Sequence, residues 1–227
     1  MRIGLIGQGP QGKRYLAPAN GGEHITRVLT RLDRDLGNWG GLDGVVIATH
    51  PSSHHSLVMQ ALAHGLHVLC EKPLCLNKHD LKEILKARDN ANRRLMVAHT
   101  HLYSEAFQQV RKDYAPLNKS RRLSIWWGGP RERHMHIPPS LDWGCHARAM
   151  AYALGAERLE MIARDQPYRT RRLVIDGELA YTGDEPCERS AMWHMMEAFA
   201  NGDADDTEEE LRAIYEPLFL ARDEGTL

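Results

Sequence analysis

The sequence predicts an α/β protein with two domains, the first of them built on a doubly wound, mostly parallel sheet. From residue 1 to residue 98, short apolar runs typical of buried strands alternate with segments whose apolar residues have helical spacing. After residue 98 this alternation stops, and short strands and helices follow in irregular order. We therefore expect one domain over residues 1–98 and a second, α+β domain over residues 99–227.

The composition excludes several classes of function. With 227 residues, 42% of them hydrophobic, the chain can bury a substantial core. The 29 basic and 30 acidic side chains nearly cancel, so no charge excess favours nucleic acid or a membrane surface. No apolar run approaches the roughly 20 residues of a membrane-spanning helix, and the N-terminus enters a strand at once, so we expect no signal peptide. The cysteines lack C-x-x-C spacing and predict reduced thiols in a cytoplasmic protein: Cys70, Cys75, Cys145 and Cys187.

The first strand, residues 2–6, runs directly into the glycine-rich segment Gly7-Gln8-Gly9-Pro10-Gln11-Gly12. In a dinucleotide-binding turn, the first glycine of this G-x-G-x-x-G pattern permits the tight turn, and the second lets the backbone approach a pyrophosphate. The third permits close contact between strand and helix. The position of the motif after an N-terminal strand favours a dinucleotide site over an ordinary turn.

The segment from Ile25 to Leu32 fits either a helix or a strand, and its β-branched residues favour a strand. Asp33 follows it, about 20 residues after the glycine loop, where a Rossmann unit places the acidic residue that binds the adenosine ribose. Arg31 and Arg34 flank Asp33 and are suited instead to a 2′-phosphate. The choice between NAD and NADP therefore stays open, as does the alternative that these are ordinary surface charges.

Three further strands complete the first domain, and a helix follows each of the first two. The strands are predicted at residues 44–49, 67–70 and 95–98. The first helix has its apolar residues at core spacing. The second covers residues 78–90, and Asn77 is suited to cap it.

The strand at residues 67–70 ends in Glu71, Lys72 and Pro73, and charged residues of this kind rarely follow a buried strand. Open α/β sheets bind ligands at the carboxyl ends of their strands. A lysine at this place can donate a hydrogen bond or a proton to a reacting oxygen. The alternative is a salt bridge at the surface. We also expect a cis Lys72–Pro73 bond, because cis peptide bonds are nearly confined to proline.

The second domain opens with a helix near residues 104–114 and a strand at residues 123–127. Asp142 then opens a helix expected to run to about Leu154, and His146 lies one turn further on. Residues four apart share one face of a helix, so this pair is suited to hold a substrate oxygen and to relay its proton. The alternative is an N-capping aspartate beside a buried structural histidine.

The rest of the chain predicts three strands and two helices. Asp176-Gly177, between two apolar runs, is a hairpin turn signal. Thr207 with Glu210 forms a capping box for the last helix. The strands are expected at residues 159–163, 172–175 and 178–182.

The 13 histidines raise the question of a metal site. Two groups are loosely zinc-like, but neither forms an H-E-x-x-H motif or a Cys/His framework, so no metal is predicted. No strand–turn–helix elbow supports a serine or cysteine nucleophile. The two groups are His50, His54 and His55, and His134 with His136.

Four blocks, in chain order, resemble the Gfo/Idh/MocA oxidoreductase family: Gly7–Gly12, Ala48–His54, Gly65–Leu74 and Asp142-x-Gly144-x-His146. The resemblance implies a Rossmann-like domain that binds NAD or NADP, and an α+β domain with a mainly antiparallel sheet, here shorter than is usual for the family. It also implies that Lys72 lies beside the nicotinamide and the substrate. Asp142 and His146 would bind substrate, with the histidine as acid or base.

The same resemblance implies hydride transfer between the nicotinamide and a carbinol or carbonyl carbon of a small sugar-, cyclitol- or polyol-like substrate. The alternatives are reduction of an imine or double bond, glycoside cleavage with bound NAD, and a non-catalytic dinucleotide-binding sensor or partner subunit. Because the family's second-domain sheet commonly forms the oligomer interface, a homo-oligomer through this sheet is a further implication. The cofactor contacts are expected at Gly7, Gly9, Pro10, Gln11, Gly12, Asp33, Arg34, Thr49, His50, Pro51, His54, Glu71 and Lys72.

Overall fold

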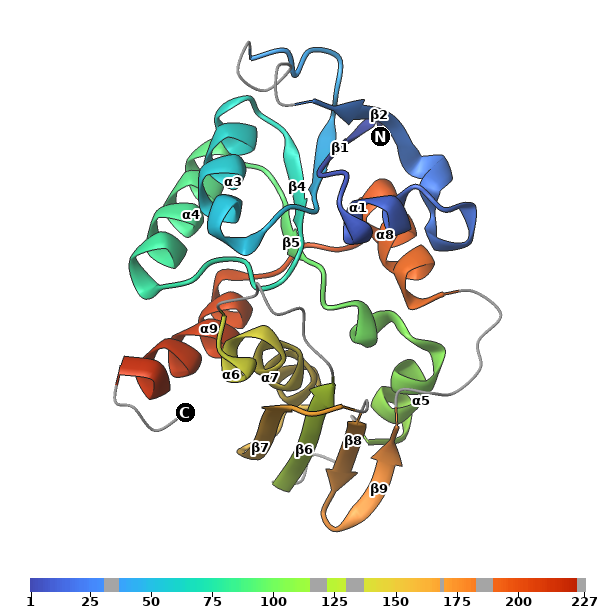
Figure 1. The fold of residues 1–227 in the computed structure, drawn as a ribbon, viewed down its shortest axis with the longest axis vertical. Coiled ribbons are helices and arrows are strands. Elements are labelled where there is room, and N and C mark those ends of the chain that lie inside the picture. Colours follow the sequence, from blue (N-terminus) through green and yellow to red (C-terminus); the bar gives the residue numbers. More distant parts are fainter. Residues whose placement is uncertain (31–36, 115–121, 130–136, 168–169, 183–189, 224–227) are drawn as a thin grey trace. The chain divides into compact units, whose positions relative to one another are not determined.

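The computed structural model describes residues 1–30, 37–114, 122–129, 137–167, 170–182 and 190–223. The chain forms two compact units (Figure 1). The first consists of Met1–Thr100 and Arg189–Glu208, and the second of His101–Glu188 and Glu209–Leu227. The chain therefore leaves the first unit near residue 100, returns to it once, and ends in the second.

A five-stranded parallel sheet forms the centre of the first unit. Its strands stand in the order β2-β1-β3-β4-β5, and each neighbouring pair is parallel. All residues of β1 and β3 are buried, as expected for a parallel sheet that helices cover on both faces. The order reverses between β1 and β3, and doubly wound sheets bind ligands at the carboxyl ends of strands at this point. The strands are β1 (Ile3–Ile6), β2 (Ile25–Leu29), β3 (Gly44–Ile47), β4 (His67–Cys70) and β5 (Leu95–Val97).

Helices lie on both faces of this sheet, α3 and α4 on one face and α1 and α8 on the other (Figure 1). α1 (Pro10–Tyr15) is short. α3 (His54–Ala63) buries the apolar residues that the sequence predicts for its inner face. The Asn77 side chain accepts a hydrogen bond from the Asp80 N–H and so caps α4 (Lys78–Ala91). The predicted doubly wound parallel sheet is therefore confirmed.

The helix α8 (Ala191–Asn201) belongs to the first unit although it lies far along the chain. Just before it, Ser190 Oγ donates a hydrogen bond to the Ala19 carbonyl. Trp193 Nε1 donates to Glu23 Oε1. A division at residue 98 does not anticipate this return, because the return depends on contacts between segments that are distant in sequence.

The second unit is built on a four-stranded mixed sheet in the order β7-β6-β8-β9. β6 pairs in parallel with β7, whereas β6 with β8 and β8 with β9 are antiparallel pairs. Asp176 and Gly177 have positive φ angles of 51° and 97° and form the predicted hairpin turn between β8 and β9. The strands are β6 (Arg122–Gly129), β7 (Arg158–Asp165), β8 (Thr170–Ile175) and β9 (Glu178–Tyr181).

The inner face of this sheet packs against helices and forms the core of the second unit. Leu123, Ile125 and Trp127 alternate along β6, and all three are buried in one cluster with Phe107 of α5 and Met150 of α7. The helices are α5 (Glu105–Tyr114), α6 (Pro139–Asp142), α7 (Gly144–Ala153) and α9 (Glu208–Asp223). Among the helices of both units, none within the described residues is long and apolar enough to cross a membrane.

Asp142 and His146 do not share one helix, so the predicted helix start at Asp142 is wrong. α6 is a single short turn that begins at Pro139 and ends at Asp142, and α7 begins at Gly144. Proline favours the first position of a helix, and the Trp143 N–H then donates to the Pro139 carbonyl and closes this separate turn. The aspartate therefore lies before α7, and the histidine lies within its first turn.

Candidate functional site

The loop between β1 and α1 uses its three glycines for three different reasons. Gly7 has a positive φ of 111°, and a Cβ there would collide with the Ala48 carbonyl, just after β3. A Cβ on Gly12 would collide with the Gly7 carbonyl, whereas a Cβ on Gly9 would meet no atom within 4 Å. Protein packing thus requires Gly7 and Gly12 but leaves open space at Gly9, where a dinucleotide-binding turn admits the pyrophosphate. The loop therefore fits a dinucleotide.

Glu71, at the end of β4, is held by the helix that follows this loop. It is only 8% exposed. Gln11 Nε2 and Tyr15 OH donate hydrogen bonds to its Oε1 at 2.6 and 2.8 Å. The Lys72 N–H donates to Oε2 at 3.2 Å. Burial raises the pKa of the Glu71 carboxyl above its usual value, although these donors oppose the shift. Glu71 thus fixes the start of the Lys72 segment relative to α1.

Lys72 follows this anchor, is partly buried, and is joined to Pro73 by the expected cis bond. The ring nitrogens of His54 lie 2.8 Å from the Pro73 carbonyl oxygen and 3.1 Å from that of Thr49, so His54 ties the loop after β3 to the loop after β4. Burial lowers the pKa of His54 and brings the pKa of His99 down to about 3, and the charge of Lys72 contributes to both shifts. Lys72 therefore carries its positive charge among neutral imidazoles.

The loop after β3 is shaped by its own side chains. Thr49 Oγ1 lies 2.8 Å from Ser53 Oγ, and His50 Nδ1 accepts a hydrogen bond from the Ser52 N–H. Pro51 starts the short 3-10 turn η3 (Pro51–Ser53) that leads into α3.

The predicted cofactor residues that the structure describes thus gather after β1, β3 and β4, which are neighbours in a parallel sheet and end at one edge. Asp33, predicted to bind the ribose, and Arg31 and Arg34, suited instead to a 2′-phosphate, lie outside the described residues, as do His134 and His136.

The buried, neutral state of His99 predicts a loss of stability in acid. Its folded pKa of about 3 lies below the value near 6.5 of an unfolded histidine, so between these values only the unfolded chain takes up the proton. This contribution is fully present above about pH 6.5 and is lost as the pH falls. We expect His99 to account for about 2–3 kcal/mol of the unfolding free energy lost between pH 7 and pH 4.5. Urea unfolding at both pH values checks this. His99→Asn should lose less unfolding free energy between the two pH values than the wild type does, and an equal loss would show that His99 is not the cause.

In the second unit, His146 belongs to an aromatic cluster. Its ring lies 5.9 Å from that of Trp127 in a stacked arrangement and 5.1 Å from that of His101, edge to face, measured between centroids. His101 Nδ1 lies 3.2 Å from Tyr181 OH, which lies 3.3 Å from Ser104 Oγ. The cluster therefore combines a buried histidine with a chain of groups that can exchange hydrogen bonds with a hydroxylated ligand.

Asp142 and His146 are both buried, at 2% and 6% exposure, on either side of Trp143. The sequence prediction missed Tyr15, which holds Glu71, and the partners of His146 in the cluster. His101 carried a signal, because it follows β5 as Lys72 follows β4. The others carried none, because their partners are distant in sequence.

The described cysteines are unsuited to act as nucleophiles. Cys70, Cys75 and Cys145 are free and buried. Burial raises the pKa of the Cys70 and Cys75 thiols, so both stay protonated at neutral pH, and the thiolate is the reactive form. Cys187 lies outside the described residues.

Residues 29–99 match the model of the Gfo/Idh/MocA family, described as an oxidoreductase family with an NAD-binding Rossmann fold. This part of the chain is therefore similar to the NAD-binding Rossmann domain of that family. It is similar to D-apiose dehydrogenase of Rhizobium rhizogenes, with 36% identity over 89 residues, 39% of this chain and 25% of that protein. With inositol 2-dehydrogenase 1 of Saccharopolyspora erythraea it shares 27% identity over 121 residues, 43% of this chain and 36% of that protein. The chain thus matches well under half the length of these relatives.

Solved structures share the fold over nearly the whole chain. The WlbA dehydrogenase of Thermus thermophilus, in complex with NAD and UDP-GlcNAcA, superposes with a TM-score of 0.76 at 14% identity, over 98% of this chain and 94% of that chain. The myo-inositol 2-dehydrogenase of Lactobacillus plantarum gives a TM-score of 0.76 at 13% identity, over 99% and 98%. At such identities the likeness shows the fold, a parallel Rossmann-like sheet followed by a mixed sheet.

Proposed function

We propose that this protein is an NAD(P)-dependent oxidoreductase that transfers hydride between the nicotinamide and a carbinol or carbonyl carbon of a sugar-, cyclitol- or polyol-like substrate. The observation that carries the proposal is the position of Lys72, fixed by the buried Glu71, which Gln11 and Tyr15 bind from the helix after the glycine loop. A lysine held beside the dinucleotide loop is suited to act on an oxygen next to the nicotinamide. The similarity to D-apiose and inositol dehydrogenases supports the substrate class.

Each polar residue has a role in this proposal. NAD(P) bound at the glycine loop supplies or accepts the hydride. Lys72 donates a hydrogen bond to the reacting oxygen and stabilises the negative charge that develops there. His146 removes the hydroxyl proton during oxidation and returns it during reduction. Asp142 accepts a hydrogen bond from a neighbouring hydroxyl and orients the substrate, and the pair of His101 and Tyr181 is suited to hold another hydroxyl.

A turnover screen tests the proposed reaction. The purified chain is mixed with NAD⁺ or NADP⁺ and a panel of cyclitols, aldoses and linear polyols, and the absorbance of the reduced nicotinamide is followed. We expect reduction with at least one member of the panel. Tight dinucleotide binding without reduction by any member would indicate a sensor instead, and sugar release from glycosides without net reduction would indicate glycoside cleavage.

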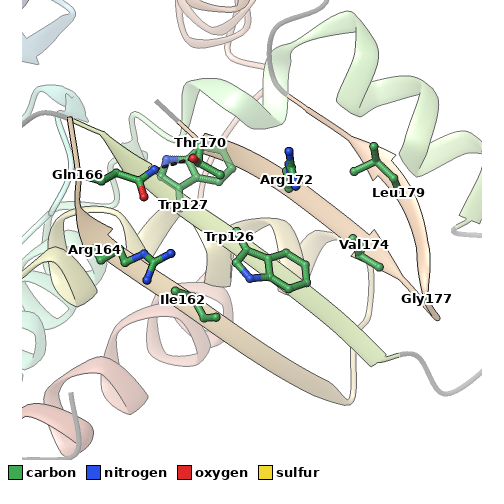
Figure 2. A pocket seen from close by; sticks show the side chains of 10 residues that line it. All are labelled: Trp126, Trp127, Ile162, Arg164, Gln166, Thr170, Arg172, Val174, Gly177 and Leu179. Carbon is green, nitrogen blue, oxygen red and sulfur yellow. Dashed lines mark hydrogen bonds between the residues drawn. The ribbon is translucent and has the colours of Figure 1, made fainter. Parts of the chain in front are cut away.

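We further propose that the outer face of the second-unit sheet binds a second copy of the chain. Figure 2 shows Trp126 on this face together with the aliphatic side chains of Ile162, Val174 and Leu179. These side chains border a hollow of about 440 Å³. Ile162 is 37% exposed and Leu179 59% exposed, although both are large and apolar. Arg164 and Arg172 lie beside these apolar side chains. Protein interfaces are typically enriched in aromatic residues and arginine. The hollow is lined by Trp126, Ile162, Arg164, Gln166, Thr170, Arg172, Val174, Gly177 and Leu179, together with Trp127, whose ring packs into the inner cluster.

A charge placed on this face is expected to separate the copies. Trp126 projects from β6 into the hollow (Figure 2). In Trp126→Glu, assembly would bury an unpaired carboxylate at the interface, and the cost of removing this charge from water opposes association. Light scattering after size exclusion should give a dimer or larger assembly for the wild type and a monomer for the variant. Tyr152→Glu, at a 37% exposed aromatic of α7, serves as the control and should keep the wild-type mass. A monomeric wild type would refute the proposed assembly.

A further inference from the structure

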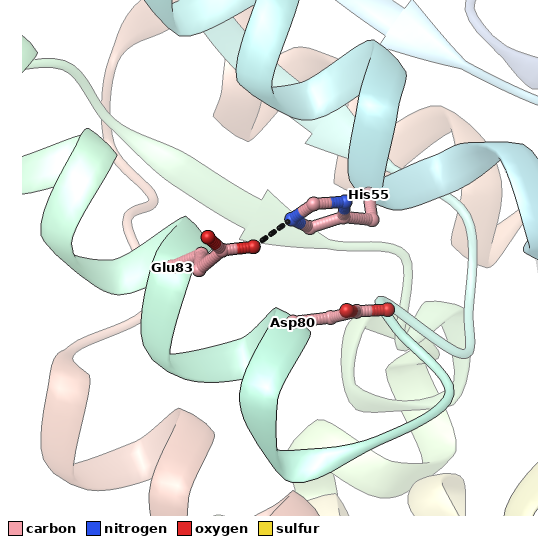
Figure 3. Close-up of side chains that lie close together, drawn as sticks. All are labelled: His55, Asp80 and Glu83. Atoms are coloured by element: carbon pink, nitrogen blue, oxygen red, sulfur yellow. Dashed lines mark ion pairs between the residues drawn. The ribbon is translucent and has the colours of Figure 1, made fainter.

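Histidine and carboxylate side chains meet between α3 and α4 of the first unit, apart from the residues assigned to the cofactor (Figure 3). His55 lies in the first turn of α3, and Asp80 and Glu83 lie near the start of α4. One nitrogen or oxygen atom from each of the three lies within 4.8 Å of the others. His55 Nε2 lies 3.0 Å from Glu83 Oε2.

We propose that His55, Asp80 and Glu83 bind a divalent transition-metal ion, with Zn²⁺ as the best match. One imidazole nitrogen and two carboxylates form a ligand set that suits Zn²⁺ and its neighbours, whereas Mg²⁺ and Ca²⁺ prefer sites made of oxygen alone. With bonds of about 2.0–2.1 Å, the ligand atoms of a tetrahedral site lie roughly 3.3 Å apart. The pair of His55 and Glu83 already has this spacing, and small rotations of Asp80 would complete the set.

An ion pair with Glu83 does not give the Nε2 atom of His55 a hydrogen-bond partner. Its Nε2 atom is shielded from solvent, and among the described residues it finds no partner with hydrogen-bond geometry, although Glu83 Oε2 is near. A metal ion would bind the lone pair of this nitrogen and so supply the missing partner, with no need for an N–H bond that points at Glu83. The ion would have access, because the side chains of His55 and Glu83 are 29% and 45% exposed.

A fourth donor stands beside the set. His79 precedes Asp80, and its Nδ1 lies 3.5 Å from Glu83 Oε2 and 3.8 Å from Asp80 Oδ1. Its side chain is 77% exposed and can reorient at little cost. Structural zinc sites usually have four ligands, and either His79 or water can complete this one.

The position of the site indicates what the ion would do. α3 follows the loop after β3, and α4 follows the loop that contains Lys72. His54, next to His55, contacts the Pro73 carbonyl in that second loop. An ion bound between the two helices would therefore hold the segments that follow the two loops in fixed positions. It would also stabilise the folded first unit, because the three ligands come together only in the folded state.

Titration of the metal-free full-length chain with Zn²⁺ tests the proposal, with calorimetry for stoichiometry and thermal unfolding as a second readout. We expect saturable binding with the site filled by one ion, a rise in Tm on adding Zn²⁺, and no rise with Mg²⁺. His55→Ala and Glu83→Gln should each weaken this binding at least about tenfold, since loss of even outer-shell partners costs that much. Both variants should also lose the Zn²⁺-dependent rise in Tm.

Matched variants at or near the same two helices test whether residues outside the cluster contribute to Zn²⁺ binding. His64→Ala, at the end of α3, and Asp89→Asn, in α4, lie outside the cluster and should bind Zn²⁺ as the wild type does. Circular dichroism confirms that each variant is folded. The proposal is overturned if His55→Ala and Glu83→Gln bind as tightly as the wild type, or if no saturable binding occurs.

Discussion

Replacing Lys72 by alanine is expected to lower kcat about 10²–10³-fold, the range typical for loss of a donor that stabilises negative charge developing on a reacting oxygen. The dinucleotide affinity should stay near that of the wild type, because the glycine loop and the Glu71 anchor remain. The physical reason is the charge distribution at the end of β4. Burial leaves the neighbouring His54 and His99 neutral at physiological pH, so neither can replace the positive charge that Lys72 is proposed to place beside the reacting oxygen.

The measurement is a steady-state rate with the best substrate from the turnover screen, together with calorimetric titration of the dinucleotide. Lys82→Ala is a suitable control, because Lys82 is an exposed lysine of α4, ten positions further along the chain. It should turn over as the wild type does. If Lys72→Ala also keeps wild-type turnover, the assignment of Lys72 is wrong.

A pair of glycine variants should separate folding from cofactor binding. Gly12→Ala forces a Cβ against the Gly7 carbonyl, and we expect a loss of about 1–3 kcal/mol in the unfolding free energy, as for other overpacked sites. Gly9→Ala adds a Cβ that meets no protein atom within 4 Å, so its unfolding free energy should stay within about 0.5 kcal/mol of the wild type. Its dinucleotide affinity should nevertheless fall at least about tenfold, because the added Cβ would occupy the space proposed for the pyrophosphate. A tenfold fall corresponds to a loss of about 1.4 kcal/mol in binding free energy.

Urea unfolding and calorimetric titration, applied to both variants, decide this prediction. The informative result is the dissociation of the two effects: a stable Gly9→Ala protein that binds dinucleotide poorly. Wild-type affinity in Gly9→Ala would mean that the space beside Gly9 does not receive the pyrophosphate. Unchanged stability in Gly12→Ala would mean that the loop relaxes more easily than its packing indicates.

The features that the sequence predicted correctly are those with local causes. The tight turn at Gly7–Gly12, the cap at Asn77 and the hairpin turn at Asp176-Gly177 each have a signature within a few consecutive residues, and the structure confirms these three local features. The strand before Glu71 was predictable because a buried parallel strand is a continuous apolar run. Local signals therefore sufficed to predict the Rossmann-like sheet.

Most of the features that the sequence did not predict depend on partners that are distant in sequence. Tyr15 donates to Glu71, 56 positions away, and no local pattern marks such a pair. The return of α8 to the first unit and the meeting of His101 with Tyr181 have the same origin. Likewise, the carboxylates beside His55 come from another helix, so a search for histidine spacing could not find them. The helix start at Asp142 failed for a local reason, since Pro139 begins a separate turn.

Direct transfer of hydrogen to the nicotinamide is the central claim, and isotope labelling tests it most directly. A polyol substrate deuterated at its carbinol carbons is oxidised by the chain with unlabelled NAD⁺ or NADP⁺, and the reduced dinucleotide is analysed by mass spectrometry and NMR. We expect one deuterium at the nicotinamide C4 for each molecule of substrate oxidised. Reduced dinucleotide without deuterium, or oxidised product without reduced dinucleotide, would contradict the proposed hydride transfer.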